Sequence, residues 1–417
     1  MMKKLFCLIL LVCGLSALHA ELNPPHRYFE LGVDVEAAVA NSWFSVTDFF
    51  QETLVVDFTK MSQQLNNGLG VNFDLNAGVN MDINVGSIFR LGVFGGLSGT
   101  GQFNLSQGII DFLAEGNASG DHSIEAGVVV DSLLYAEAGA SFQTFVKNLG
   151  ISFSPVVFLP VVYIPRTEMT AMVVPSEDGT RIDVRADAAV YSILGIEQFE
   201  SAINVNEMLD INTMGLDISL GAEYALFPFL DIGASVRNIP IIPGRLKYKT
   251  DITASFEYTT EEMFDSMLGK DDESGEEKKS SDESSDAIRL PEKSQYLEDP
   301  QTVRRPTYIG LSASYRPFGE WFNVRGGIDF VINTPFYVNF NLGAGFHLLR
   351  MSRLGGHLFN FTLDTGYQQR MWTQRVGLVL NLRAFELDLS VSSCSGNFLR
   401  SFMGAGLGVG VGVRLGF

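Results

Sequence analysis

Cysteine is almost absent from this sequence of 417 residues, and so are long apolar runs. Two of the three cysteines lie in the N-terminal apolar segment, which leaves Cys394 alone in the rest of the chain. A single cysteine forms no internal disulfide and cannot build a cysteine-rich metal cluster. No later stretch holds the roughly 18 consecutive apolar residues that a membrane-spanning helix needs.

Patterns typical of catalysis or nucleic-acid binding are missing as well. The five histidines are scattered, and no two of them stand at metal-ligand spacing. There is no Gly-x-Ser-x-Gly elbow and no phosphate-binding loop. A net charge of −19 without a basic patch is a poor match for nucleic acid. We therefore expect a protein that is not an enzyme, needs no cofactor or metal, and binds no nucleic acid.

Residues 1–20 have the composition of a signal peptide. Lys3 and Lys4 supply the positive start, residues 5–12 an apolar core, and Ala20 a small residue at the expected cut, which could shift by a few residues. An exported chain without a membrane helix is either a soluble protein or a closed β-barrel. Besides the α-helix, a closed barrel is the structure whose backbone is fully hydrogen-bonded inside lipid.

Alternation of apolar and polar residues decides between these two classes. In residues 403–417 every odd position is apolar, and every even position is glycine except Arg414. Residues 29–39 and 71–85 alternate in the same way. About ten tilted residues cross a membrane, so strands of this length and number favour a barrel over a soluble β-sandwich with half-buried strands. The predicted fold of residues 21–417 is one all-β, transmembrane antiparallel barrel.

The strand count is about fourteen, and it becomes sixteen if residues 164–182 hide a further hairpin. With Phe417 on the periplasmic side, the three tightest connections fall on that side too, at residues 224–229, 315–321 and 382–386. An even strand number is consistent with this arrangement. Leu415 and Phe417 resemble the terminal signal by which outer-membrane barrels are recognised by the barrel-assembly machinery.

Three segments with helical spacing and one acidic segment on the outer side depart from the alternation. Residues 41–69 include apolar residues at helical spacing between positions 46 and 65 and predict a helical plug or hatch at the outer mouth. A helix lying on the outer lipid surface is the alternative. Shorter helices are predicted at 109–114 and 197–209. Residues 259–305 form an acidic segment, which we expect to be a disordered loop on the cell surface.

With these features the sequence resembles the FadL-type long-chain fatty acid transporters of outer membranes. The resemblance lies in the signal peptide, the strands, the internal helices and the terminal phenylalanine, together with Asn23-Pro24-Pro25. It implies cargo release through an inward kink in the third strand, where this chain has four glycines that could act as a lateral gate: Gly95, Gly96, Gly99 and Gly101. Glycine packing against a plug explains them equally well. The long N-terminal hatch of that family is missing, so the helix in residues 41–69 would replace it.

A passive transporter of long-chain fatty acids or similar hydrophobic molecules is therefore the function we expect. The apolar face of the plug helix would contact the cargo through Phe49, Phe50, Leu54, Phe58 and Met61. The alternatives are a general diffusion porin and a surface-exposed structural or adhesive barrel that works through its acidic loop. The expected partners are outer-membrane lipid, hydrophobic small molecules and the barrel-assembly machinery, and the expected state is a monomer.

Overall fold

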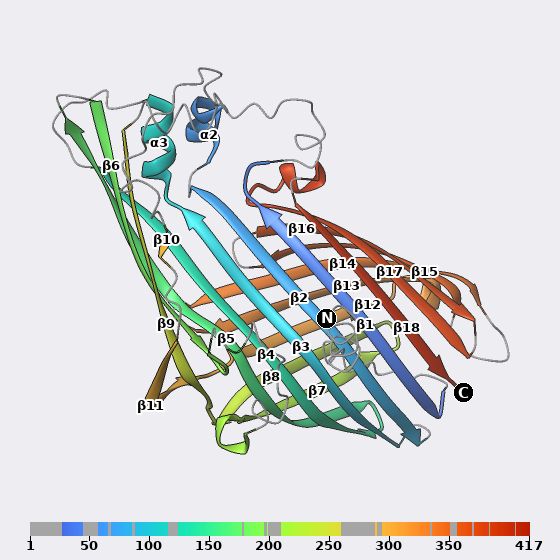
Figure 1. Ribbon diagram of the computed structural model, residues 1–417. Helices are drawn as coiled ribbons and strands as arrows, with labels where there is room; N and C mark the ends of the chain where they lie inside the picture. Colours follow the sequence, from blue (N-terminus) through green and yellow to red (C-terminus); the bar gives the residue numbers. More distant parts are fainter. Residues whose placement is uncertain are drawn as a thin grey trace, which may run out of the picture.

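The computed structural model shows an antiparallel β-barrel with short helices at one end (Figure 1). It describes residues 27–44, 57–65, 68–85, 88–115, 124–176, 179–195, 198, 210–259, 288–289, 294–333, 336–350, 357–368, 371–382, 384–404 and 406–417. The predicted signal peptide, most of the acidic segment and nearly all of the helix predicted at 197–209 lie outside these residues.

Fourteen strands pair in a closed circuit, and β1 completes it by pairing with β18. In order round the wall they are β1 (Phe29–Asn41), β2 (Leu69–Val85), β3 (Phe89–Leu105), β4 (Ile124–Val146), β5 (Leu149–Ser176), β7 (Gly215–Phe227), β8 (Leu230–Ile242), β12 (Thr307–Tyr315), β13 (Phe322–Ile332), β14 (Tyr337–Arg350), β15 (His357–Gln368), β16 (Met371–Leu382), β17 (Phe385–Ser395) and β18 (Leu407–Gly416). The predicted number of fourteen is confirmed.

Four further strands lie outside the closed circuit and form a sheet on the second half of β5, which we call the outer sheet. They are β6 (Gly179–Ser192), β9 (Gly244–Thr259), β10 (Ile288–Arg289) and β11 (Gln295–Val303). β5 pairs with β7 as far as Phe158, and from Val162 onward it pairs with β6. The hairpin suspected within 164–182 is therefore present, but it belongs to this outer sheet. Within this sheet β9 pairs with β6.

The presence of β11 corrects the prediction of a disordered loop over the whole of 259–305. β11 pairs with the start of β9, and the ring of Tyr296 lies edge-on to Tyr248 of β9 with 5.6 Å between centroids. The low-complexity run ends at Asp286, and β11, although it holds Glu298 and Asp299, also has Tyr296, Leu297 and Val303 as apolar and aromatic side chains with which to pack.

The two faces of the wall follow the predicted alternation. In β18, Leu407, Val409 and Val411 are exposed on the lipid side, whereas the intervening glycines are buried on the lumen side. This strand starts at Leu407 and not at Met403 as predicted. Gly404 adopts a φ of +74°, which reverses the chain, so the residues before it belong to a turn.

Tight turns and rings of aromatic residues mark the two ends of the barrel. The predicted connections at 224–229, 315–321 and 382–386 all lie at the end that holds Phe417, as expected. At this end the rings of Phe318 and Trp321 stack, with 5.5 Å between centroids. At the opposite end Tyr367 and Trp372 lie together on the lipid side. Aromatic girdles at both membrane interfaces are typical of transmembrane barrels.

The helices of the outer end are short. They are α2 (Phe58–Gln64) between β1 and β2 and α3 (Gln107–Glu115) between β3 and β4. The second of these matches the helix predicted at 109–114. Single helical turns lie at η2 (Ile211–Thr213), η3 (Gly319–Trp321) and η4 (Arg400–Phe402). Within the described ranges, no helix has the length and apolar character needed to cross a bilayer.

Candidate functional site: the capped barrel lumen

An apolar cluster holds α2 and α3 together at the outer end of the barrel. Met61 of α2 and Ile110 of α3 are each only 1% exposed, and Leu65 is buried beside them. Trp43, Phe58 and Leu69 are partly buried against the same cluster. We call the six residues of this cluster the outer cap. They explain the apolar side of the predicted plug helix, since a helix of this kind needs a partner that excludes water.

The outer cap brings together two of the predicted ligand-binding residues, Phe58 and Met61. Phe49, Phe50 and Leu54 lie outside the described residues. The described part of the helix packs on α3 and not on the lipid side of the wall, so the alternative of an interfacial helix is wrong for residues 58–64. The side chain of Asp57 starts this helix by accepting a hydrogen bond of 3.0 Å from the backbone N–H of Lys60.

Polar contacts fix the two helices in place around the apolar cluster. Ser62 donates from its hydroxyl to Asp111 over 2.6 Å. Gln107 donates to the same carboxylate over 2.7 Å and to the Ser62 carbonyl over 3.0 Å, and its Oε1 accepts from the N–H of Gly68 over 3.1 Å. Sequence reasoning missed this contact set. Its detectable part is the spacing of Gln107 and Asp111, four residues apart on one helix face.

A third outer connection, between β17 and β18, is tied to the outer cap by Arg400. Its guanidinium lies 4.1 Å from the centroid of the Trp43 ring, and Nη1 donates to the Trp43 carbonyl over 3.4 Å. Nη2 also donates to Gln64 at the end of α2. Three outer connections, which are far apart in the sequence, therefore meet at one cap.

The lumen wall below the cap is polar, and its glycines have a specific role. Arg325 of β13 reaches Asp364 of β15 over 2.8 Å, across the intervening Gly343 of β14. A Cβ at position 343 would collide with Asp364 and lie 3.0 Å from Arg325 Nε. The glycine therefore lets the ion pair lie flat on the wall.

The same arrangement recurs at β18. Arg375 of β16 crosses β17 and β18 to reach Glu36 of β1 over 3.0 Å, and it donates to Ser390 on the way over 2.8 Å. Gly410 lies beneath, with its Cβ position 3.3 Å from Arg375 Nη2. In the last strand, Gly410 therefore leaves room for a crossing arginine, and a Cβ at Gly408 would instead collide with Ser392 and Ala38 of the neighbouring strands.

A buried ion cluster stands where β5 leaves the wall. Arg305, in the connection from β11 to β12, forms ion pairs with Glu137 of β4 and with Asp217 of β7, the latter over 2.7 Å. Its guanidinium also packs on the rings of Tyr135 and Phe158, with centroid distances of 5.2 and 4.8 Å, and these two rings meet edge to face. The cluster therefore links the outer sheet to two wall strands, and an apolar core lies in the same junction: Leu159, Ile193, Leu194, Leu246 and Val303.

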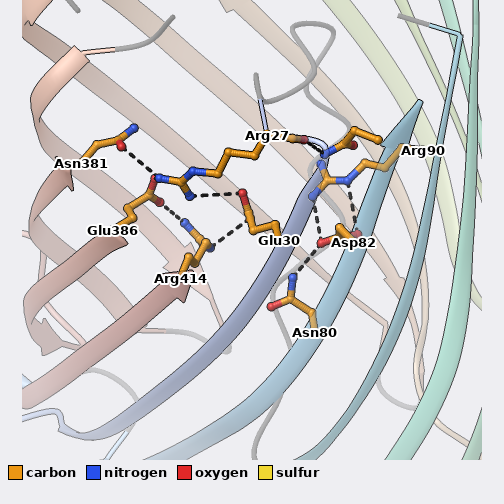
Figure 2. A network of polar contacts seen from close by, with 9 residues as sticks. Arg27, Glu30, Asn80, Asp82, Arg90, Asn381, Glu386 and Arg414 are labelled. Carbon is orange, nitrogen blue, oxygen red and sulfur yellow. Dashed lines mark hydrogen bonds and ion pairs between the residues drawn. The ribbon is translucent and has the colours of Figure 1, made fainter. Parts of the chain in front are cut away.

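A second polar network spans the closing seam of the barrel at its other end (Figure 2). Arg27 donates to Asn381 over 2.9 Å and to Glu30 over 3.3 Å, and Arg414 of β18 donates to Glu386 of β17 over 2.6 Å. The side chains come from strands at both ends of the sequence. The network thus joins the first and last strands on the lumen side of their seam.

The predicted assembly residues lie on the lipid side of this seam. Leu415 is about half exposed, and the ring of Phe417 stacks on Phe29 with 5.6 Å between centroids. The Phe417 carbonyl also accepts from the N–H of Tyr28 over 2.7 Å. Recognition of these residues by the assembly machinery stays a prediction.

The expected kink in the third strand is not seen. β3 pairs with β2 and with β4 from Phe89 to Leu105 without a register shift. Gly95, Gly99 and Gly101 lie on the lipid side, and Gly96 faces the lumen opposite Glu137. The register breaks of this region lie in the pairing of β4 with β5. A lateral gate at the four glycines therefore stays a prediction that the described backbone does not support.

Comparison with known proteins gives a family and a set of similar folds. The profile of a family of unknown function (DUF5723) matches residues 25–415, so the chain belongs to that family. No curated protein matches the sequence. Similar solved structures include a mutant of the TodX monoaromatic hydrocarbon channel, with 11% identity, 95% of this chain and 91% of the other covered, and a TM-score of 0.47.

The toluene transporter TbuX of Ralstonia pickettii is similar at 10% identity, with 95% and 90% of the two chains covered and a TM-score of 0.45. The toluene transporter TodX of Pseudomonas putida has 12% identity, 93% and 88% coverage and a TM-score of 0.39. These channels are FadL-type transporters, the group that the sequence resembles. All three TM-scores lie below 0.5.

Proposed function

We propose that this member of the family is a passive outer-membrane channel for hydrophobic small molecules, with long-chain fatty acids as its cargo. The observation that carries the proposal is the outer cap, in which Met61 and Ile110 are withdrawn from water above a polar wall. An apolar molecule that enters this cluster leaves water for an apolar surface, at roughly 25 cal/mol for each Å² buried. Phe58 and Met61 would contact it, together with Phe49, Phe50 and Leu54.

Binding measured on purified protein tests the proposal. The probes are a fluorescent long-chain fatty acid and an uncharged aromatic dye, in detergent below the concentration at which the micelles absorb them. Met61→Gln places an amide in the apolar cluster and should weaken binding of both probes several-fold. Ile211→Gln is the control, because Ile211 is 83% exposed and outside the outer cap. Failure of the unaltered protein to bind either probe would remove the proposal.

The two probes separate the class of cargo from the specific cargo. Binding of the dye without the fatty acid would support a hydrophobic channel and exclude fatty acids as its cargo.

Sideways release at Gly95 to Gly101 is the exit that the family resemblance suggests. It predicts that bulky residues at these positions slow transfer of cargo into vesicles without weakening binding.

A general diffusion porin is the second candidate, and the polar wall favours it. Arginines that lie flat against their carboxylate partners, such as Arg375 on Glu36, leave the lumen lined by polar groups. A porin predicts large, steady conductance in planar bilayers and passage of small sugars. Neither property is expected of a channel whose outer mouth is covered by an apolar cap.

A further inference from the structure

The turn between β17 and β18 exposes an unusual amount of apolar surface at the outer end of the barrel. This outer turn comprises residues 396–404 and includes η4, the red helical turn near the top of Figure 1. Leu399 is 70% exposed, Phe402 62% and Met403 69%. A turn surrounded by water would hold polar residues at such positions, so these three side chains point to a nonaqueous partner.

A row of aromatic rings connects the outer turn to the lipid side of the wall. The rings in contact, from the wall to the turn, are Phe340, Tyr367, Trp372, Phe398 and Phe402. Phe340 and Trp372 share the lipid side with Leu342 and Leu378, as the strand register shows. The exposed surface of the turn therefore continues the surface that already faces lipid.

Polar contacts on the other side of the turn hold it in this position. Ser401 is fully buried, accepts from Gln374 over 3.0 Å and donates to the Phe398 carbonyl over 2.6 Å. Asn397 accepts from the N–H of Leu399 over 2.9 Å. The only charged residue of the turn, Arg400, is held on Trp43. The apolar residues cannot turn inward without breaking these contacts.

We propose that the outer turn is a lipid-binding site, seated in the outer leaflet, where acyl chains of membrane lipids cover Leu399, Phe402 and Met403. Continuity with the lipid side of the wall favours lipid over a second copy of the chain. The composition of the turn agrees, since residues 396–404 contain no acid in a chain with a net charge of −19. Through Arg400 the same turn connects the outer cap to the membrane surface.

Fluorescence quenching by brominated lipids tests this site without any cargo. The three tryptophans, Trp43, Trp321 and Trp372, are replaced by phenylalanine, which keeps a ring at each position. One tryptophan is then introduced by Leu399→Trp, or by Met403→Trp should the first variant fail to fold. The protein is inserted into phosphatidylcholine vesicles brominated close to the headgroup or deep in the acyl chain.

The controls are Leu378→Trp on the lipid side of the wall and Tyr296→Trp on the outer sheet, where Tyr296 is 60% exposed. We expect Leu399→Trp to lose most of its fluorescence to the shallow bromines, whereas Leu378→Trp is quenched by lipid and Tyr296→Trp is not. Quenching of Leu399→Trp only by aqueous acrylamide would place the turn in water and overturn the proposal. Protection from both quenchers would show that protein covers the turn, which would overturn it as well.

Discussion

Replacing Arg305 by methionine should strongly destabilise the barrel, because Arg305 is the counter-charge of two buried carboxylates. The Arg305 side chain is 2% exposed, and its partners Glu137 and Asp217 are 6% and 1% exposed. Methionine has a similar length and can keep the contact with the rings of Tyr135 and Phe158. What remains is two buried carboxylates without a counter-charge. Breaking a buried ion pair in this way costs about 3–5 kcal/mol.

The measurement is the free energy of unfolding in urea, with the protein in lipid vesicles and folding followed by tryptophan fluorescence and by gel mobility. The control is Arg350→Met. Arg350 pairs with Glu320 over 3.1 Å, but both side chains are more than 60% exposed, so this pair should contribute little. Adding Glu137→Gln and Asp217→Asn to Arg305→Met should recover much of the loss, because no buried charge is then left.

The explanation by buried charge is wrong if Arg305→Met lowers the free energy of unfolding no more than Arg350→Met does. It would also fail if the triple variant were less stable than the single one, since the loss would then reflect packing and not charge. If Arg305→Met loosened only the outer sheet and left the barrel wall equally stable, Arg305 would stabilise β11 alone. Proteolysis within the outer sheet before and after the substitution distinguishes that case.

Two further substitutions test the lumen wall and the cap. Gly343→Val should destabilise the barrel by breaking the Arg325–Asp364 ion pair, whereas Gly95→Ala, whose Cβ would meet its nearest neighbour at 3.5 Å, should be tolerated; urea unfolding compares them. Asp57→Ala should speed hydrogen exchange in α2, and Asp57→Asn should not. The backbone N–H of Lys60 holds the pKa of Asp57 below its ordinary 3.8. The Asp57 carboxylate at the start of α2 therefore stabilises the helix above pH 3.8, and this contribution is lost as the pH falls through the lowered pKa. Hydrogen exchange measured at low pH can detect the loss.

The regular part of the fold could be predicted from the sequence because a barrel strand has one repeating unit of two residues. That period separates the lipid and lumen sides of β18 and β2 without knowledge of any partner strand. Helical spacing likewise predicted the described turns of α2. The outer sheet was harder to place. Its strands alternate as wall strands do, and only the change of partner along β5 at Phe158 moves them out of the barrel.

The polar contacts could not be predicted, because they depend on register between distant strands. Arg375 and Glu36 are 339 residues apart, and their contact requires β17 and β18 to lie between them with glycine at one crossing point. Arg305 follows β11 in a short irregular connection, where no period indicates which side it faces. Its partners come from β4 and β7. Sequence shows that such residues exist but not which of them meet.

The outer cap favours an apolar molecule, whereas the wall with its paired charges favours a polar one. An apolar cargo gains by entering the cluster around Met61 and Ile110, but further down it meets paired charges such as Arg325 and Asp364. Moving along that wall would return its surface to water, so under the proposed function the outer cap is the part of the described chain that such a cargo would favour. A passive channel must also let its cargo leave. If the proposed cargo is right, the cap therefore has to open toward a second apolar phase, and the lipid around the outer turn is the nearest one that the described residues provide.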